Sequence, residues 1–512
     1  MNLESLPGAV AVVLVAVATV VIGTWGLRLS RTTSDFLVAS RTVGPAMNAS
    51  AIAGEYLSAA SFLGVAGLVL TFGADMAWYP IGWTAGYLVL LVLVAAPLRR
   101  SGAYTLPDFA EARLGSRGAR SACSLLVVAI GWLYLLPQFQ GAGITLAAAL
   151  DAPRWVGPVT VGAVVLVSVG TGGMRSITLV QAVQYWLKLT ALLVPVSVLL
   201  VVWLGDGSPG PVGGGDAAGG GSWSLPLAEG GGQGLYSTYS LIVATFLGTM
   251  GLPHVVVRFY TNPDGRAARR TTLVVLGLLG AFYVLPPVYA ALGRVYGAAP
   301  ARADSLVLDL PRLMVPGLGG ELLTGLVTAG AYAAFLSTSS GLTVAVAGVL
   351  TQDLTARARL GGLRLPDAAA FRLAVVVAVA VPLATALALP DLGVARAVGL
   401  AFAVAASTFC PLLVLGIWWP GLTAPGAVAG LVTGGLGSAA AVAWTLVDGT
   451  SPGPVATGWT ATLLGQPAAW SVPLSFATMV LLSLATRSRR PAHTRRFLVR
   501  LHTPEALEVD RG

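Results

Sequence analysis

Charged residues are scarce in this sequence. Asp, Glu, Lys and Arg make up 10% of its 512 residues, against about 25% in a typical soluble domain. Apolar residues make up 56%. A soluble fold cannot bury so much apolar surface and still cover itself with polar groups. The composition therefore excludes a soluble enzyme, a nucleic-acid-binding protein and a disordered chain, and it favours an all-α polytopic membrane protein.

Cysteine and histidine are scarce as well. The two cysteines, Cys123 and Cys410, lie far apart in apolar runs, which excludes a disulfide framework. The three histidines match no zinc-binding spacing. A membrane-embedded enzyme needs a cluster of His, Asp or Glu within its spans, and Glu55 is the one clear case. We therefore expect no enzyme and no cofactor, and the short stretch after residue 486 is too small for the output domain of a sensor.

Long apolar runs are what the sequence has in abundance. A transmembrane helix needs about 20 apolar residues, and runs bounded by charged or turn-forming residues predict about 13 such helices. The first run is preceded by the acidic residue Glu4 and by no basic residue. We therefore interpret this run as a retained span rather than a signal peptide. The runs lie near residues 8–27, 46–71, 76–98, 121–150, 155–171, 176–204, 236–257, 271–293, 320–352, 371–389, 392–418, 423–447 and 470–486.

The basic residues predict the orientation of these spans. With the N-terminus outside, the inner segments carry 24 of the 30 Lys and Arg residues, Arg258 included, and the outer segments carry five. The remaining one, Lys188, lies within a span. Positive charge gathers on the cytoplasmic side of membrane proteins. We therefore expect a multi-pass protein of the cell (plasma or inner) membrane with its N-terminus outside and its C-terminus in the cytoplasm.

Two predicted spans contain residues that interrupt a helix. The run 46–71 contains Gly54, and the run 236–257 contains Pro253 after two glycines. These spans are five apart in the order of spans, and interrupted helices in corresponding positions of two halves are typical of inverted-repeat transporters. The alternative is that the two glycines of the second run, Gly248 and Gly251, serve close helix packing.

A run of hydroxyl residues marks the span near 320–352. Ala334, Ser337, Thr338 and Gly341 share one face of that helix, at the spacing of three and four residues. Unwound backbone in a broken helix exposes carbonyl oxygens, which together with hydroxyls suit a small hard cation. The alternative is that the hydroxyls bond to the preceding turn of their own helix.

Two ionisable residues inside predicted spans are functional candidates by default. Glu55 lies beside the proposed break, where it balances the charge of a cation, takes up a proton or hydrogen-bonds the frayed backbone. These three roles stay open. Lys188 lies in the run 176–204 and either takes part in function or extends its ammonium to a membrane surface.

Six segments in order along the chain resemble the sodium/solute symporter family, and specifically its bacterial cation/acetate (monocarboxylate) branch. The resemblance runs from about residue 35 to 355, and the order of spans continues it to the C-terminus. The matching segments are Asp35–Arg41, Ala51–Gly64, Tyr104–Phe109, Gly172–Met174, Gly251–Thr261, and Leu336–Thr338 with Thr351–Leu354.

The resemblance implies a LeuT-type 5+5 inverted repeat with broken first and sixth core helices and alternating access. It also implies a sodium site at the family's conserved position, and a substrate site lined by the broken helices. Carried over, the sodium ligands are the carbonyl oxygens of Gly54, Leu57 and Ala334 and the hydroxyls of Ser337 and Thr338. The substrate-site candidates are Tyr56, Ser61, Gln138 and Thr249.

The sequence departs from the family pattern at two positions. Glu55 stands where the acetate branch usually has Asp, and the added methylene puts the details of coupling in doubt. Gln181 stands where proline and sugar transporters of the family carry an Asp. A proline- or sugar-type substrate is therefore disfavoured.

These observations predict a symporter in which a sodium gradient drives uptake of a small monocarboxylate such as acetate, propionate or pyruvate. The alternatives are another organic acid, an amino acid or a vitamin, and protons in place of sodium. Sodium is the co-transported ligand; the expected partners are a small organic anion and membrane lipid, with no nucleic acid and no obligate protein partner. The predicted parts are 1–45 (N-terminal peripheral span and loop), 46–418 (transporter core, with repeats 46–204 and 236–418 and external glycine-rich loop 205–235), 419–486 (two peripheral spans) and 487–512 (basic cytoplasmic tail).

The predicted topology is tested with single cysteines. A cysteine placed in 210–230 is expected to react with a membrane-impermeant thiol reagent added outside cells, and one placed in 492–505 is not, because an odd number of spans separates the chain ends. Labelling of both regions from the same side would refute this topology.

Overall fold

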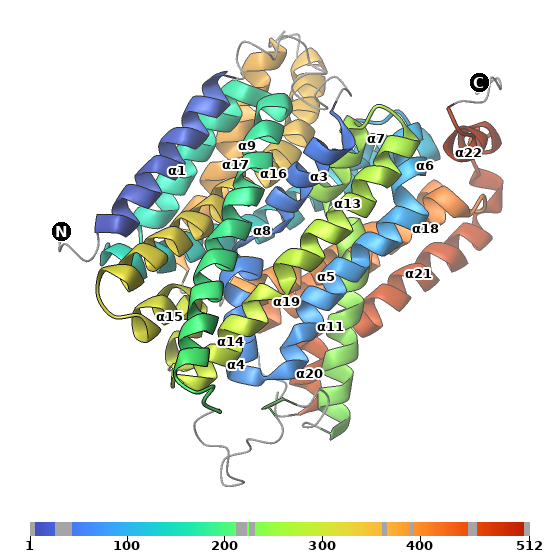
Figure 1. The fold of residues 1–512 in the computed structure, drawn as a ribbon. Helices are drawn as coiled ribbons and strands as arrows, with labels where there is room; N and C mark the ends of the chain where they lie inside the picture. The colour runs from blue at the N-terminus through green and yellow to red at the C-terminus, as the bar shows by residue number, and fades with distance from the viewer. Residues whose placement is uncertain are drawn as a thin grey trace.

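The described residues of the computed structural model form an all-helical bundle without strands (Figure 1). They are residues 6–25, 43–210, 223–224, 231–298, 300–360, 366–389, 394–448 and 458–505. The helices of the first half are α1 (Leu6–Trp25), α3 (Pro45–Tyr56), α4 (Val65–Phe72), α5 (Trp78–Val89), α6 (Ala95–Arg100), α7 (Leu106–Leu114), α8 (Arg117–Leu150) and α9 (Val156–Gly205). Those of the second half are α11 (Gly231–Gly251), α12 (Pro253–Val257), α13 (Gly265–Tyr283), α14 (Leu285–Val295), α15 (Leu306–Met314), α16 (Leu318–Leu360), α17 (Asp367–Ala388), α18 (Val394–Trp418), α19 (Ala424–Asp448), α20 (Trp459–Gly465), α21 (Ala468–Ala485) and α22 (Thr494–His502).

The predicted apolar runs coincide with helices of this bundle. Within the described ranges, 11 helices are long and apolar enough to cross a membrane, and a bent helix pair brings the number to 12. The predicted run near 155–171 forms a shorter apolar helix, Val156–Gly172, at the start of α9. The predicted all-α polytopic architecture is confirmed, and its helix count of about 13 exceeds the number of full-length spans by this short segment.

The first predicted interruption is a sharp break. The segments Pro45–Tyr56 and Ala60–Phe72 meet at an angle of 70°. Leu57 leaves the helical conformation with φ −72° and ψ 85°, and the chain re-enters a helix through a π-helical turn, Ala60–Gly64. The side-chain oxygen of Gln138 on α8 accepts a hydrogen bond of 3.0 Å from the backbone N–H of Ala59. The amide of Gln138 therefore caps the second half of the broken helix.

The second interruption is milder. The extended residue Leu252 (ψ 119°) separates α11 from α12, which begins at Pro253. A proline disfavours the helical conformation of the residue before it, which explains the position of this break. Gly248 and Gly251 lie inside α11, where a Cβ atom would come within 2.5 Å of α18 backbone oxygens. These two glycines therefore serve close helix packing, as the alternative interpretation proposed.

The helix α16 passes through the interior of the bundle. In the most apolar 18-residue stretch of its membrane-crossing part, Leu318–Gln352, 94% of the residues are buried, and α3, α8 and α9 pack against this helix. α1 borders one side of the bundle, and α21 and α22 border the opposite side (Figure 1). The interior position of α16 brings Ser337 and Thr338 against the break between α3 and α4.

Several predicted segments fall partly outside the described residues, and the predicted division into parts stays a prediction. They include 26–42, which holds the segment Asp35–Arg41, and residues 211–222 and 225–230 of the predicted loop 205–235. The predicted tail contains α22, which packs against α6 and α7, and its last seven residues, 506–512, lie outside the described part.

A methyl group at Gly54 is expected to destabilise the packing of α3 on α9. A Cβ atom there would lie 2.1 Å from the backbone oxygen of Gln181, and overpacking of this kind costs about 1–3 kcal/mol. Gly54→Ala should therefore lower the unfolding temperature of the detergent-solubilised protein. The matched control is Gly170→Ala in α9, where no atom lies within 4 Å of the added carbon. An unfolding temperature unchanged by Gly54→Ala would contradict this account.

Candidate ion and substrate site

Hydroxyls of α16 meet the exposed carbonyl oxygens of the broken helix. The Ser337 hydroxyl lies 2.8 Å from the carbonyl oxygen of Gly54 and 3.0 Å from that of Ala334. The Thr338 hydroxyl donates a 2.6 Å hydrogen bond to the carbonyl oxygen of Glu55. Ser337 thus contacts two of the other four residues predicted to bind a cation, Gly54 and Ala334, and Thr338 bonds to the carbonyl of a residue next to Gly54. Their role as cation ligands stays a prediction.

The Lys188 side chain reaches the same place from α9. Its ammonium donates hydrogen bonds to the carbonyl oxygen of Gly54, to the carbonyl oxygen of Leu57 at 2.9 Å and to the Ser337 hydroxyl at 2.5 Å. The residue is completely buried, so the interpretation that Lys188 extends to a membrane surface is wrong. Three of the predicted sodium ligands, Gly54, Leu57 and Ser337, therefore accept hydrogen bonds from this one side chain.

A buried ion pair lies beside this contact. The Arg258 guanidinium donates from Nε to Glu55 Oε2 at 2.6 Å, and both side chains are at most 2% exposed. Arg258 also donates to the Thr178 hydroxyl at 2.8 Å and to the side-chain oxygen of Gln181. The Gln181 amide in turn donates to the backbone oxygen of Ser337 at 2.8 Å. The network joins α3, α9 and α16 to the 3₁₀ turn η8 (Arg258–Thr261) that follows α12.

The pattern of basic residues predicts that Arg258 lies in an inner loop, and the structure corrects this prediction. The guanidinium lies in the interior because Arg258 follows the buried helix α12 and pairs with Glu55. None of the three roles considered for Glu55 included a guanidinium partner. One signal in the sequence was available: Arg258 directly follows an apolar run and precedes the aromatic pair Phe259–Tyr260, without another basic residue nearby.

Two of the four substrate-site candidates contact each other. The Tyr56 hydroxyl lies 2.8 Å from the Thr249 hydroxyl, so these residues link the two broken helices. Ser61 instead shares a 2.8 Å hydrogen bond with the Tyr283 hydroxyl. Gln138 supports the broken backbone through Ala59, as described above. The structure therefore places Tyr56 and Thr249 in one group, and Ser61 and Gln138 with partners of their own.

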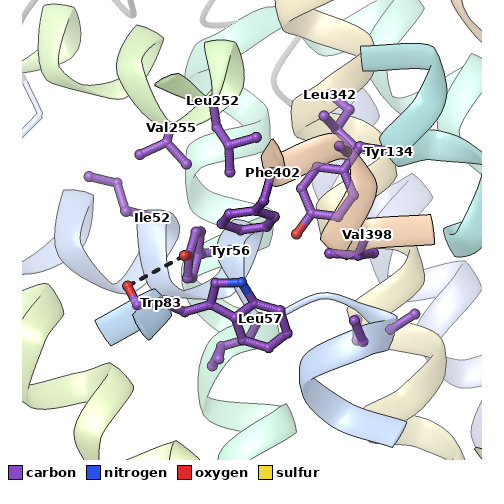
Figure 2. Packing of buried hydrophobic residues seen from close by; sticks show 14 of the residues in the cluster. Ile52, Tyr56, Leu57, Trp83, Tyr134, Leu252, Val255, Leu342, Val398 and Phe402 are labelled. Carbon is purple, nitrogen blue, oxygen red and sulfur yellow. Dashed lines mark hydrogen bonds between the residues drawn. The ribbon is translucent and has the colours of Figure 1, made fainter. Parts of the chain in front are cut away.

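An aromatic cluster surrounds Tyr56. Figure 2 shows the rings of Tyr56, Trp83 and Phe402 close together, with Tyr134 on the far side of Phe402. The Phe402 ring centroid lies 6.2 Å from Tyr56, 5.6 Å from Trp83 and 5.9 Å from Tyr134. Of these four residues the sequence predicts only Tyr56 as a substrate contact, because the others come from α5, α8 and α18, which no local pattern connects to the break.

The comparisons with known proteins place the chain in one family. The model of the sodium:solute symporter family matches residues 36–434. The "Uncharacterized symporter YwcA" of Bacillus subtilis is 32% identical over 472 residues, covering 90% of each chain. The "Monocarboxylic acid transporter" of Corynebacterium glutamicum is 33% identical over 493 residues, covering 86% of this chain and 89% of the relative.

Solved structures share the fold. A Na⁺-coupled sialic acid symporter in a substrate-bound outward-open state matches with a TM-score of 0.69 at 14% identity, covering 94% of this chain and 98% of that chain. A nucleobase-cation-symport-1 family transporter matches with a TM-score of 0.50 at 15% identity, covering 92% and 99%. These likenesses confirm the predicted LeuT-type transporter fold.

Breaking the buried ion pair is expected to destabilise the protein strongly. Glu55→Gln leaves the Arg258 guanidinium without its counter-charge, and the loss of one partner of a buried pair costs about 3–5 kcal/mol. The matched control is Glu111→Gln, since Glu111 pairs with Arg120 at the surface with its side chain 37% exposed, and such pairs contribute about 1 kcal/mol or less. Thermal unfolding in detergent measures both. Equal effects of the two substitutions would show that the buried pair has no special role.

Proposed function

The chain belongs to the sodium:solute symporter family, and on that premise we propose that it takes up a small monocarboxylate such as acetate, propionate or pyruvate, driven by an inward cation gradient. The protein is a transporter and not an enzyme. Its relative in Corynebacterium glutamicum bears the name of a monocarboxylic acid transporter, which supports this class of substrate. Transport by alternating access requires no bond to be made, only different affinities in the two access states.

The observation that carries the proposal is a second buried basic side chain, Lys188, beside the one buried carboxylate of the described network at the break. The buried charged residues of the described network are Glu55, Arg258 and Lys188. Glu55 pairs with Arg258 and also attracts the Lys188 ammonium, whose hydrogen bonds go to uncharged oxygens. One carboxylate therefore has two cations to balance. A buried charge without a counter-ion is costly in a membrane. A monocarboxylate bound near the break would balance this charge, and a neutral or cationic substrate would not.

The aromatic cluster supports a small substrate with an apolar end. Tyr56, Trp83, Tyr134 and Phe402 are buried and present ring faces and edges to one another. Small-molecule sites combine such apolar walls with a few polar groups that fix orientation. The Tyr56 and Thr249 hydroxyls provide those groups between the two broken helices. We propose Tyr56 and Thr249 as substrate contacts, with Ser61 and Gln138 as bordering residues.

Two coupling ions are compatible with the family and the fold. The family name and the structural likeness to a Na⁺-coupled symporter favour sodium, and protons remain the alternative. One elementary charge moving through 100 mV supplies about 2.3 kcal/mol. At a stoichiometry of one cation to one anion the electrical terms cancel, and the concentration gradients drive uptake. We propose residence in the cell membrane, with the N-terminus outside and the C-terminus in the cytoplasm.

Uptake into proteoliposomes tests the proposal. Labelled acetate is expected to accumulate under an imposed sodium or proton gradient and to be competed by propionate and pyruvate. Stronger competition by an amino acid, a vitamin or another organic acid would transfer the proposal to that substrate. Absence of monocarboxylate uptake under both gradients would refute it.

The same assay tests the substrate contacts. Tyr56→Phe removes the hydroxyl that bonds to Thr249 and is expected to raise the half-saturating acetate concentration severalfold. The control is Tyr289→Phe, which removes an equally buried hydroxyl that donates to the backbone oxygen of Leu192 at 3.1 Å, away from the aromatic cluster.

A further inference from the structure

The Lys188 side chain occupies the position predicted for sodium. Sodium needs several oxygen ligands around one point, and the carbonyl oxygens of Gly54 and Leu57 with the Ser337 hydroxyl are three of the five predicted here. All three contact the Lys188 ammonium. An ammonium carries three donor protons and a single positive charge, so three oxygen acceptors satisfy it completely.

The nearest negative charge is already shared by two cations of the protein. Glu55 is the carboxylate nearest to this contact: its Oε2 pairs with Arg258, its Oε1 has no hydrogen-bond partner among the described residues, and its charge attracts both Arg258 and Lys188. A sodium ion among the same oxygens would lie beside the Lys188 ammonium in a buried environment, where like charges repel strongly. The other hydroxyl among the predicted ligands is also engaged, because Thr338 donates to the carbonyl oxygen of Glu55.

Burial keeps the lysine in place. Lys188 is fully buried on α9, and its Gly54 contact lies where α3 packs so closely on α9 that no Cβ fits at residue 54. A lysine side chain anchored in this way differs from a bound ion in one respect: it cannot leave the protein. It supplies the positive charge that a sodium ion would otherwise bring from solution.

We propose that Lys188 is a tethered cation that takes the place of sodium at the Gly54–Leu57–Ser337 position, so that this position does not bind sodium. The inference rests on the proposed symport function in one respect: it assumes that a co-transported ion would bind at the break. It follows that the positive charge facing the substrate anion is built into the protein, and that no sodium is needed there to bind it.

Sodium binding to the purified full-length protein tests this inference. Thermal unfolding in detergent is compared in sodium chloride and choline chloride at equal ionic strength, because an ion that binds the folded state stabilises it. Wild type and Ser337→Ala are expected to show the same sodium-specific change in unfolding temperature, or none. Lys188→Ala frees three oxygens and the space of the side chain, and it is expected to gain a sodium-specific increase of several degrees. Lys188→Ala combined with Ser337→Ala should lose that gain.

Two matched variants keep the result interpretable. Lys188→Met fills the space with an uncharged chain and should not gain sodium binding, which separates loss of charge from creation of an open site. Should Lys188→Ala fail to fold, the comparison of wild type with Ser337→Ala decides alone. Sodium stabilisation of wild type that Ser337→Ala abolishes overturns the inference, and so does a folded Lys188→Ala that gains no sodium binding. A sodium effect equal in wild type and Ser337→Ala comes from another site and agrees with it.

The outcome is separate from that of the proposed function. Acetate uptake under any gradient tests the substrate, whereas sodium stabilisation tests the ion site. A protein that transports acetate and also binds sodium through Ser337 would keep the function and lose the inference. One that transports no monocarboxylate and shows no such sodium effect would lose the function and keep the inference.

Discussion

The break between α3 and α4 is the constraint on which the rest of the site depends. It leaves carbonyl oxygens of Gly54, Glu55 and Leu57 without partners in the broken helix, in the buried interior of the bundle where solvent does not reach them. Ser337, Thr338 and Lys188 supply the missing donors. The broken backbone and the polar groups of α9 and α16 are therefore stable only together, because either alone would leave buried polar atoms unsatisfied.

Charge is distributed around the break in a similar way. Arg258 and Glu55 form a pair that joins the two broken segments, since Glu55 lies at the end of α3 and Arg258 follows α12. Gln181 extends this connection to α16 by bonding to both Arg258 and the Ser337 backbone. Hydrogen bonds in such a network depend on one another. A rearrangement of one broken segment must therefore affect the other, which is what a transporter with two access states requires.

The charged network and the aromatic cluster meet α3 at two adjacent residues. Glu55 faces Arg258, while the adjacent Tyr56 faces Thr249 and the rings in Figure 2. One turn of an interrupted helix thus serves both a polar and an apolar environment. This arrangement is the structural basis of the proposal that the substrate has one charged and one apolar end.

The sequence by itself determined the membrane class, the positions of the apolar helices, the interruption within the run 46–71 and the hydroxyl face of Ser337 and Thr338. Each of these follows from a pattern within one segment. Only the tertiary structure decided that Lys188 reaches that break and that Arg258 is buried against Glu55 rather than placed in a loop. Contacts between residues more than 100 positions apart depend on how helices pack, and no local pattern records which long side chain fills a space between them. The sequence therefore located the oxygens of the predicted ion site, and the packing of α9 against α3 and α16 brought the Lys188 side chain into contact with them.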